Sequence, residues 1–338
     1  MQTYQLISGA GIDGLRRKEA AFRPPSAHEV RIEMEASALN FRDLAVANGQ
    51  YGSARGKEMV PLSDGVGTIV EIGASVTRFT IGDRVIPTFW PRWIDGDSSP
   101  ERTSASFGVE MDGTLTQGMV TSEEALVRAP LTVGGNAAAS ISCAGVTAWN
   151  ALFVRGQLEP GSTVLILGTG SVAIWALQLA TAAGMKVIVT SSSDDKLQHA
   201  ERLGARGLVN YRKNPEWQEE VLAQTSGKGV DLVLEVGGQD TLLRSVASVR
   251  FGGRVVVIGG LSGWGGAELP PNLLIGGNKT IEGIMVGSRR MTEDLVRFID
   301  TVKIVPVIDS EFAFADARDA YALLDSGKAF GKVIIRAN

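Results

Sequence analysis

The first third of the chain alternates hydrophobic and polar residues with a period of two. Between positions 30 and 36, Val, Ile, Met and Ala are separated by Arg31, Glu33 and Glu35. A strand with one buried face has this period, because successive side chains point to opposite faces. A second apolar run covers residues 66–72, and the turn residues Gly82 and Asp83 lead into a third run at 84–86. The pattern predicts a β-rich first domain.

Residues 88–118 show no regular period. The segment is rich in Trp, Pro, Gly, Ser and Asp. An irregular stretch of this length inside a compact domain is more often a functional loop than part of the scaffold. We therefore expect this segment to shape the substrate pocket.

From residue 161 onward, short apolar runs alternate with helical patterns. We expect strands at residues 163–167, 186–190, 230–236, 254–258 and 280–286, and helices at 171–183 and 194–203. Two amphipathic helices near 293–302 and 316–326 and a last strand at 332–336 follow. The alternation of strands and helices predicts an α/β fold with a parallel, doubly wound sheet.

Composition narrows the class of protein. Of the 338 residues, 44% are hydrophobic and 21% are charged, which is typical of a globular protein of two domains. The net charge of −4 leaves no basic excess to bind nucleic-acid phosphates. A single cysteine excludes an internal disulfide, and one Cys with two His residues makes a zinc site hard to build.

The apolar stretches of the chain do not indicate a membrane protein. Residues 1–15 lack the basic and then apolar segments of a secretory leader. Residues 129–154 and 160–185 carry no charge and have the length of a membrane span. The first contains Pro130 and several Gly, Ser and Asn residues, and the second divides into a strand, a turn and a helix. We expect both to be buried in an α/β core and the protein to be cytoplasmic, with no membrane partner.

A glycine-rich turn between a predicted strand and a predicted helix carries the clearest chemistry. It reads Gly168-Thr169-Gly170-Ser171-Val172-Ala173, which fits the pattern G-x-G-x-x-A. In a dinucleotide-binding unit the first glycine allows a tight turn, the second lets the pyrophosphate approach the backbone, and a small third residue packs helix against strand. The N–H groups that begin the helix then bind the phosphates. We expect dinucleotide binding here.

The end of the second strand of this unit distinguishes NADP from NAD. A carboxylate about 20 residues after the turn binds the ribose 2′-hydroxyl of NAD and would repel the 2′-phosphate of NADP. Here the polar residues expected at this rim are Ser191, Ser192, Ser193, Lys196, Tyr211 and Arg212. Because hydroxyls and a cation suit a phosphate, we expect NADP. The alternative is that Asp194 or Asp195 turns inward and binds NAD.

Ordered motifs along nearly the whole chain resemble those of the medium-chain dehydrogenase/reductase superfamily. They are Asn40-Phe41-Arg42-Asp43, Pro61-Leu62-Ser63-Asp64-Gly65-Val66-Gly67, Gly82-Asp83-Arg84-Val85, Cys143-Ala144-Gly145-Val146-Thr147-Ala148-Trp149, the glycine turn and Phe330-Gly331-Lys332-Val333. The resemblance is closest to the zinc-independent, quinone-oxidoreductase-like branch. It implies a GroES-like catalytic domain at residues 1–128 and 290–338, a Rossmann nucleotide domain at 129–289, and a homodimer formed through the nucleotide domain.

The same resemblance identifies positions where zinc ligands are missing. Zinc alcohol dehydrogenases of this superfamily have a Cys at the position of Asn40, a His-Glu pair at Ser63-Asp64, and a third ligand at the position of Cys143. A catalytic zinc needs three protein ligands, so the resemblance implies a metal-free pocket. Cys143 is then expected to be a small buried hydrophobic residue, with a direct catalytic role as the alternative. The polar neighbours of His28 and His199 in the sequence lead us to expect that both face solvent.

The resemblance also assigns roles to individual residues. Asn40 and Thr147 lie at the nicotinamide end of the cofactor, where the amide of Asn40 is a hydrogen-bond donor. Tyr51 is either the proton donor or a packed aromatic residue of its loop, and Asp43 is mainly structural. The other residues assigned to the cofactor are Gly259, Leu261, Val286 and Lys332. The candidates for an apolar substrate wall, or alternatively for anchors of the irregular loop, are Phe41, Trp90, Trp93 and Phe107.

Together these features favour an NADPH-dependent oxidoreductase. We expect hydride transfer to a quinone or an α,β-unsaturated carbonyl without a catalytic metal, with the proton coming from Tyr51 or water. Positioned donors can stabilise the charge that develops on the acceptor oxygen. One alternative is a zinc-free alcohol dehydrogenase, although a strong means of polarising the alcohol is missing. The other is a non-catalytic NADPH-binding protein, which would keep the same glycine turn.

Overall fold

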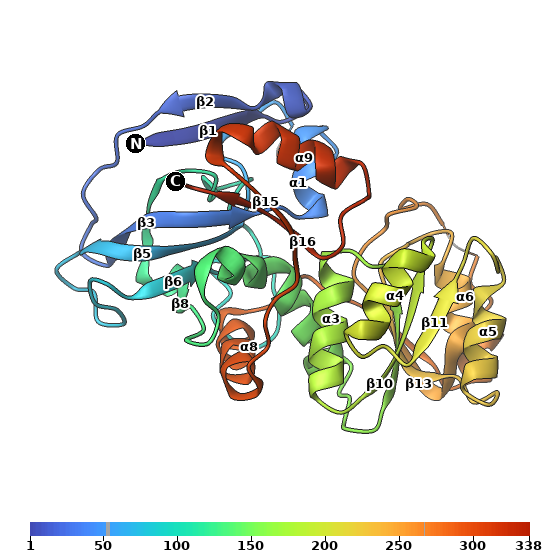
Figure 1. The fold of residues 1–338 in the computed structure, drawn as a ribbon. Helices are drawn as coiled ribbons and strands as arrows, with labels where there is room; N and C mark the ends of the chain where they lie inside the picture. The colour runs from blue at the N-terminus through green and yellow to red at the C-terminus, as the bar shows by residue number, and fades with distance from the viewer. Residues whose placement is uncertain (52–54, 267) are drawn as a thin grey trace. The chain divides into compact units, whose positions relative to one another are not determined.

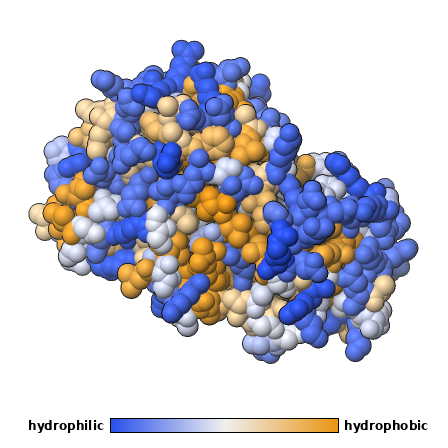
Figure 2. Space-filling view, in the orientation of Figure 1, coloured by the Kyte–Doolittle hydropathy of each residue, from blue (hydrophilic) through white to orange (hydrophobic). Residues whose placement is uncertain are grey.

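The computed structural model describes residues 1–51, 55–266 and 268–338, which form two compact units (Figure 1). Unit 1 comprises Met1–Val146 and Gly287–Asn338, and unit 2 comprises Thr147–Val286. Unit 1 is therefore made from two separate stretches of the chain, with unit 2 inserted between them in the sequence. On the face that Figure 2 shows, hydrophilic residues cover most of the surface and hydrophobic residues gather in smaller patches.

Unit 1 is built mainly from β-strands. Its larger sheet has the order β15-β16-β3-β5-β6-β8, with β7 paired to β3, and its smaller sheet has the order β2-β1-β4. The strands are β1 (Gln2–Ile7), β2 (Arg16–Glu19), β3 (Glu29–Ala38), β4 (Glu58–Met59), β5 (Asp64–Ile72), β6 (Arg84–Pro87), β7 (Gly118–Ser122), β8 (Leu126–Arg128), β15 (Ile308–Phe312) and β16 (Lys332–Arg336). In β3 the apolar residues at positions 30, 32, 34 and 36 are buried. The strand predicted from their alternation is confirmed.

Unit 1 also contains helices and short helical turns. They are α1 (Phe41–Ala47), α8 (Arg289–Val302) and α9 (Ala317–Asp325), with 3-10 turns at Ile12–Gly14, Glu123–Ala125, Gly135–Ser140 and Phe314–Asp316 and a π-helical turn at Ile141–Gly145. One continuous helical segment, Gly135–Arg155, is long and apolar enough to cross a membrane by length and composition alone. Because 72% of its apolar window is buried inside the protein, the segment has the character of a core helix.

Glycine in β5 lets the backbones of β3 and β5 approach closely. A Cβ atom at Gly67 would lie 2.4 Å from the carbonyl oxygen of Glu33, so a side chain there would push the strands apart. The register between the strands shifts between Met34 and Ala36, as in a β-bulge that bends one strand. The bend lies just before the end of β3, where Ala38 pairs with Asp64.

Unit 2 is a six-stranded parallel sheet with the order β11-β10-β9-β12-β13-β14. The strands are β9 (Thr163–Leu167), β10 (Lys186–Ser191), β11 (Gly207–Asn210), β12 (Val230–Glu235), β13 (Val249–Val257) and β14 (Thr280–Gly283). The helices are α2 (Val146–Trp149), a π-helical turn (Asn150–Arg155), α3 (Ser171–Ala182), α4 (Asp194–Arg202), α5 (Trp217–Gln224), α6 (Leu242–Ser248) and α7 (Pro271–Ile275). Numbered within the unit, the strand order is 3-2-1-4-5-6, the arrangement of a dinucleotide-binding fold. The predicted α/β class and parallel sheet are confirmed.

The boundary between the units differs from the one expected from the sequence. Residues 129–146, expected in the nucleotide domain, belong to unit 1, and residues 287–289 do so as well. The reason is packing, because the turn Gly135–Ser140 lies against β3, β5 and β16 of unit 1. Residues 88–117 contain no helix or strand, as expected, and take part only in isolated bridges.

Candidate functional site

The strand registers of unit 1 bring three distant segments to one point. At the end of β3, Ala38 pairs with Asp64 of β5 on one side and with Ile334 of β16 on the other. Because β3 and β16 are antiparallel, continuing two residues beyond Ala38 places Asn40 opposite Lys332. The residues of the Asn40, Ser63-Asp64 and Lys332 motifs therefore meet although they lie far apart in the sequence.

A buried ion pair forms the centre of this cluster. The Lys332 Nζ lies 3.1 Å from Asp64 Oδ2 and donates to Asn40 Oδ1 at 2.9 Å. The side chains of Lys332 and Asp64 are 1% and 0% exposed. Ser63 Oγ donates to the other carboxylate oxygen of Asp64 at 3.1 Å. The sequence assigned Lys332 to the cofactor, whereas in the structure its ammonium is bonded to Asp64 and Asn40.

These side chains do not suit a zinc ion. An amide at Asn40 and a hydroxyl at Ser63 replace the usual thiolate and imidazole ligands, and the Lys332 ammonium already occupies the carboxylate of Asp64. Cys143 stands at the remaining ligand position, and burial raises the pKa of its thiol well above the ordinary value, with Asp64 adding to the effect. Among residues 1–51, 55–266 and 268–338, no group of three or more His, Cys, Asp or Glu side chains is placed to hold a metal.

Helix α1 holds Asn40 at the start of its first turn. Asn40 is the N-cap, and its backbone N–H donates to Asp43 Oδ2 at 2.7 Å, half of a capping box. Asp43 is fully buried, which raises its pKa to about 6, although Arg42 and the Asn40 N–H oppose the rise. Asp43 thus fixes the backbone of Asn40, in keeping with the structural role expected for it.

Arg42 connects α1 with Tyr51 and with the irregular segment. Its guanidinium donates to the Phe107 carbonyl at 2.9 Å and lies 5.3 Å from the centre of the Tyr51 ring. Burial raises the pKa of Tyr51, and the charge of Arg42 opposes that rise. Tyr51 packs against the core of unit 1, so both roles considered for it, proton donor and packed aromatic, remain compatible with its position. Arg42 was part of the Asn40 motif in the sequence, but no role was assigned to it there.

The aromatic residues proposed as a substrate wall behave mostly as anchors. Trp90, Trp93 and Phe107 are buried in unit 1, and the Trp93 indole donates to the Gly96 carbonyl at 2.9 Å. Phe41 alone of the four is exposed, at 56%. The alternative interpretation, that these residues hold the irregular loop in place, is favoured for the three buried ones. His28 and His199 are exposed, as expected.

In unit 2 the glycine turn has the geometry that a pyrophosphate requires. Gly168 has φ +78°, a left-handed conformation that favours glycine, and its N–H donates to Thr190 Oγ1 at 3.3 Å. Gly170 is the N-cap of α3, and a Cβ atom built on it meets nothing within 4 Å. The open space above Gly170 and the N–H groups that begin α3 fit the phosphates of a dinucleotide. Thr169, Ser171 and Val172 belong to the same turn, and Ala173 is buried against the sheet.

The ends of β10 and β11 supply the polar rim expected for the ribose. Ser191 is buried at the end of β10, and Ser193 caps α4 by accepting the N–H of Lys196 at 3.4 Å. Tyr211 and Arg212 follow β11 and are exposed, and Ser192 lies between the two neighbouring serines. Asp194 accepts from Asn210 and from Lys213, each at 2.6 Å. Asp194 is therefore paired with the last residue of β11 and with Lys213 beyond it, and its pKa is lowered by the Lys213 bond.

The loops after β12, β13 and β14 carry the remaining cofactor candidates. Gly259 and Leu261 follow β13, and the Leu261 N–H donates to the Val236 carbonyl at 3.1 Å. Val286 follows β14 with φ +51°, a strained value for a β-branched residue, and its carbonyl accepts from Asn150 Nδ2 at 2.8 Å. Thr147, in α2, is buried. All these loops extend from the carboxyl ends of parallel strands, where ligands of such sheets bind.

Glu235 is a site residue that sequence reasoning missed. Its carboxylate is fully buried at the end of β12. It accepts from the Gly237 N–H at 2.6 Å, the Gly238 N–H at 3.0 Å and Thr241 Oγ1 at 2.7 Å, and also from Ser245 Oγ. The signal in the sequence is a carboxylate at the end of an apolar strand, followed after Val236 by the pair Gly237-Gly238. Glu235 fixes the loop that faces the glycine turn along the edge of the sheet.

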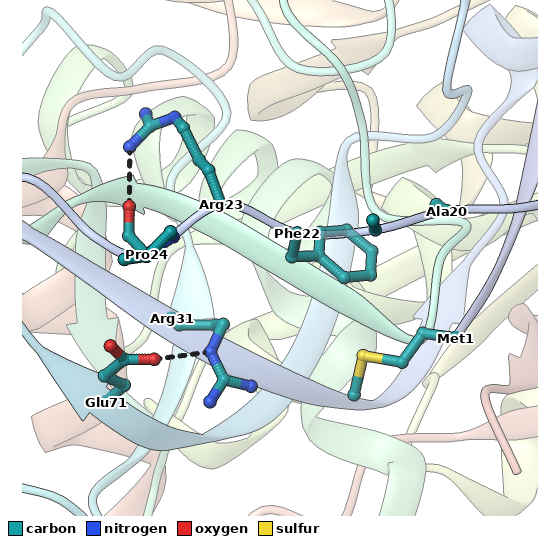
Figure 3. A pocket seen from close by; sticks show the side chains of 8 residues that line it. Met1, Ala20, Phe22, Arg23, Pro24, Arg31 and Glu71 are labelled. Carbon is teal, nitrogen blue, oxygen red and sulfur yellow. Dashed lines mark hydrogen bonds and ion pairs between the residues drawn. The ribbon is translucent and has the colours of Figure 1, made fainter.

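Unit 1 has a surface hollow of about 440 Å³ that is separate from the candidate site residues described above. Figure 3 shows the Arg31–Glu71 ion pair, 2.9 Å long, at one side of it and Phe22 and Met1 at the other. None of the residues assigned to the cofactor or to catalysis lines this hollow.

Comparisons with known proteins agree with both units. The family described as alcohol dehydrogenase GroES-like domain matches residues 26–133, and the family described as zinc-binding dehydrogenase matches residues 171–301. A zinc-type alcohol dehydrogenase-like protein of Schizosaccharomyces pombe is 39% identical over 316 residues, covering 91% of this chain and 90% of that protein. The chain belongs to the medium-chain dehydrogenase/reductase superfamily.

Solved structures of this superfamily share the whole fold. A Sinorhizobium meliloti protein described as an alcohol dehydrogenase is 38% identical, with a TM-score of 0.92 and coverage of 99% of this chain and 98% of its own. A quinone oxidoreductase of Pseudomonas syringae is 26% identical, with a TM-score of 0.83 and 99% coverage of each chain. As a medium-chain dehydrogenase/reductase, the protein is an NAD(P)-dependent oxidoreductase.

Proposed function

We propose that the protein is an NADPH-dependent reductase of quinones or α,β-unsaturated carbonyls that works without a catalytic metal. The observation that carries the proposal is the Asn40–Lys332–Asp64 cluster, which puts an ammonium ion where zinc-dependent relatives of the superfamily assemble metal ligands. Oxidation of an alcohol requires its hydroxyl to be polarised and deprotonated. Reduction of a conjugated carbonyl requires only a positioned donor for the oxygen that gains charge.

A bound nicotinamide would supply the hydride, and residues of the protein supply the remaining steps. In unit 2, Gly168, Gly170 and the start of α3 hold the pyrophosphate, and the hydroxyl-lined rim with Lys196 holds the 2′-phosphate. In unit 1, the amide of Asn40 donates to the acceptor oxygen. Since its pKa is raised, the Tyr51 hydroxyl keeps its proton at neutral pH and can protonate the reduced substrate, with water as the alternative donor.

The reaction is tested by following NADPH absorbance against quinones, enones and aldehydes, and NADP⁺ absorbance against secondary alcohols. We expect turnover with quinones or enones and far less than one zinc per purified chain by elemental analysis. Turnover confined to alcohols, with activity lost on chelation and restored by zinc, would contradict the proposal. Tight NADPH binding without turnover of any substrate would identify a non-catalytic binding protein.

The proton donor is tested with Tyr51→Phe, which removes the hydroxyl and keeps the ring over Arg42. A fall in kcat of about 100-fold with unchanged KM would assign the proton to Tyr51, because general acids contribute on this scale. A fall of less than about threefold would assign it to water. Solvent isotope effects on kcat measured in both proteins provide the control.

The preference for NADP is tested by titrating NADPH and NADH separately. We expect tighter binding of NADPH, and we expect Lys196→Ala to reduce that preference about tenfold by removing a charge-assisted contact with the 2′-phosphate. Lys186→Ala is the matched control, since Lys186 lies at the opposite end of β10. A clear preference of the unmodified protein for NADH would contradict the assignment.

A further inference from the structure

One half of the Asn40 amide is hydrogen-bonded and the other half is not. Its Oδ1 accepts from the Lys332 ammonium at 2.9 Å. Its Nδ2 has no hydrogen-bond partner in the part of the chain that the structure describes, although the residue is only 5% exposed. An unpaired buried donor is costly in free energy, so native proteins seldom keep one unless a ligand or a reaction uses it.

Lys332 determines which half of the amide is available. An ammonium group has three donors and no acceptor, so it can bind only the amide oxygen. Rotating the Asn40 side chain by half a turn would place its NH2 group against a cation. The Asp64 carboxylate lies 3.1 Å from Lys332 Nζ and balances its charge within the protein interior.

We propose that the NH2 group of Asn40 binds the acceptor oxygen of the substrate and stabilises the negative charge that develops there, and that Lys332 is the positioning residue that orients and polarises this amide. The inference rests on the function proposed above and identifies the group that replaces a metal in it. Donation from the ammonium to Oδ1 withdraws electrons from the amide and strengthens its N–H donors, because hydrogen bonds in a chain polarise one another.

Reduction of the conjugated carbonyl takes up one hydride and one proton. Hydride from NADPH adds to the carbon conjugated with the acceptor oxygen, the carbon–carbon double bond shifts, and the oxygen becomes an enolate or phenolate oxygen. That oxygen accepts a hydrogen bond from Asn40 Nδ2. A proton from Tyr51 or water then neutralises the product.

The decisive variant is Asn40→Asp. Aspartate still offers an oxygen to Lys332 and is a good N-cap for α1. It replaces the NH2 donor with a second oxygen, and the negative charge that it adds lies against the Lys332 ammonium. We expect kcat with an enone or quinone to fall about 100-fold, the loss typical of one oxyanion donor, with an unchanged urea midpoint. Near-normal kcat in a folded Asn40→Asp variant would overturn the proposal.

The positioning role of Lys332 is tested with two charge-neutral double variants. Lys332→Gln/Asp64→Asn retains a donor toward Asn40 Oδ1, whereas Lys332→Met/Asp64→Asn does not. We expect the Gln variant to keep a kcat about tenfold above that of the Met variant at equal urea midpoints. Equal kcat values in the two double variants would show that Lys332 has only a structural role.

A binding measurement separates this inference from the proposed reaction. The probe is 4-nitrophenol, whose phenolate absorbs visible light, added with NADP⁺ at a pH where half of the free dye is ionised. We expect binding to the unmodified protein to increase the ionised fraction and Asn40→Asp to abolish that increase. If no enone or quinone is turned over, the proposed reaction fails, while this titration still reports on the amide. An unmodified protein that leaves the ionised fraction unchanged would refute the role of Asn40.

Discussion

Asp43 is a carboxyl group whose environment favours its neutral form. Burial raises its pKa from the ordinary 3.8 to about 6, and the neighbouring Arg42 and the Asn40 N–H only partly offset this. The folded chain therefore holds this proton more tightly than the unfolded chain does. The stability that the proton provides is complete below pH 3.8 and is lost as the pH rises through about 6.

Replacing Asp43 with Asn removes this titration and keeps an oxygen for the Asn40 N–H. Relative to the unmodified protein, Asp43→Asn should gain up to about 3 kcal/mol in free energy of unfolding between pH 4 and pH 7. Urea unfolding at several pH values measures the difference. Glu29→Gln is a comparison of opposite sign, because the bond to Arg23 lowers the pKa of Glu29 to about 2. A difference independent of pH would contradict the assignment to Asp43.

A substitution at Gly170 tests cofactor binding without disturbing the fold. Its φ of −80° is an ordinary value, and a Cβ atom there meets nothing within 4 Å. Gly170→Val should therefore change the free energy of unfolding by less than about 1 kcal/mol. It should nevertheless weaken NADPH binding at least tenfold, because the side chain fills the space of the pyrophosphate.

Gly134 is the matched control for this substitution. It is also an N-cap with φ −80°, and a Cβ atom there likewise meets nothing within 4 Å. Gly134→Val should leave NADPH binding unchanged when the affinity is measured by fluorescence titration. Equal loss of affinity in both variants would show that the glycine turn does not bind the pyrophosphate.

The sequence singles out individual residues of the candidate site but not their partners. Gly168 has the left-handed conformation expected of a tight turn, and the assignment of Asn40 and Ser63 to the positions of zinc ligands stays a prediction. The bond between Lys332 and Asp64 was not foreseen, because 268 residues separate them and only the strand registers bring them together. Composition and periodicity describe neighbours along the chain, whereas this contact depends on the pairing of β3 with both β5 and β16.

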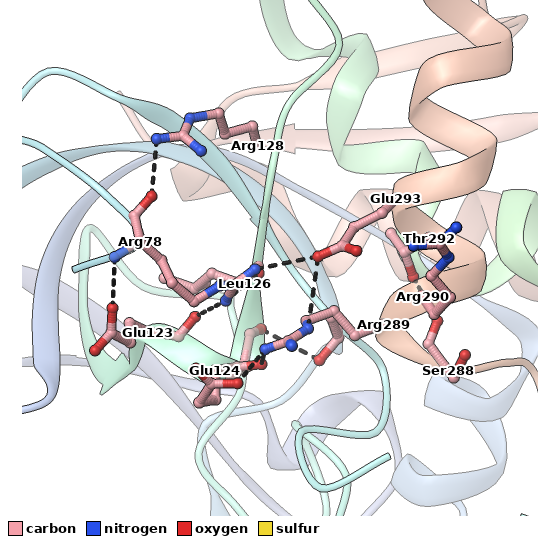
Figure 4. Close-up of polar contacts among 12 residues, drawn as sticks. Arg78, Glu123, Glu124, Leu126, Arg128, Ser288, Arg289, Arg290, Thr292 and Glu293 are labelled. Atoms are coloured by element: carbon pink, nitrogen blue, oxygen red, sulfur yellow. Dashed lines mark hydrogen bonds and ion pairs between the residues drawn. The ribbon is translucent and has the colours of Figure 1, made fainter. Parts of the chain in front are cut away.

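At the level of elements, a network of charged groups joins helix α8 to the turn between β7 and β8 (Figure 4). Arg289, the first residue of α8, donates to the Glu124 carbonyl at 3.1 Å and to the Glu124 carboxylate, and lies 3.6 Å from Glu293. Arg78 donates to Glu293 at 3.2 Å and to the Leu126 carbonyl at 3.1 Å. Burial lowers the pKa of Arg78, and the like charge of Arg289 adds to this effect.

This network predicts unequal effects at two adjacent arginines. Arg289→Met removes a side chain that is 14% exposed together with its charge-assisted bonds, and should lower the free energy of unfolding by about 1–3 kcal/mol. Arg290 is 54% exposed and pairs only with Asp294 of its own helix in the described chain. Arg290→Met should therefore change stability by less than about 0.5 kcal/mol. Thermal unfolding of both variants measures this, and equal effects would contradict the role of the network.

Elements with a strong local pattern were predicted well. The strands at 163–167 and 332–336 have the expected bounds, and α3 and α4 each end one residue earlier than expected. The short strand β11 was missed, because Gly207–Asn210 has no alternating pattern and is a strand through its pairing with β10. Strand β13 begins at Val249, whereas the sequence predicted a start at residue 254. The pairing of β13 with β12 shifts in register between Val230 and Leu232, so the first residues of β13 do not continue the apolar pattern from which the strand was predicted.

For the whole molecule, we propose a homodimer formed through unit 2. Strand β14 ends the six-stranded sheet and pairs only with β13 in the described chain, so its outer edge is available to a second copy. The segments before and after β14 in the sequence carry exposed apolar side chains, namely Leu261, Trp264, Ile275 and Met285. An open strand edge and exposed apolar side chains in the same unit are features of interfaces between copies.

The homodimer is tested by light scattering after gel filtration. Ile275 is 81% exposed in unit 2 and Leu131 is 94% exposed in unit 1. Ile275→Lys should shift the protein toward the monomer, because a buried lysine without a partner opposes association, whereas Leu131→Lys should leave the mass unchanged. A monomeric unmodified protein at micromolar concentration would contradict the proposal.

The insertion of unit 2 within unit 1 has a consequence for how the protein is made. Unit 2 is one continuous stretch, so its sheet can close as soon as the ribosome has released residue 286. The larger sheet of unit 1 must wait for β16, which pairs with β3 across nearly the whole chain. Until then Asn40 and Asp64 have no ammonium between them. A nascent chain would therefore complete its nucleotide-binding sheet before it completes the Asn40–Lys332–Asp64 cluster.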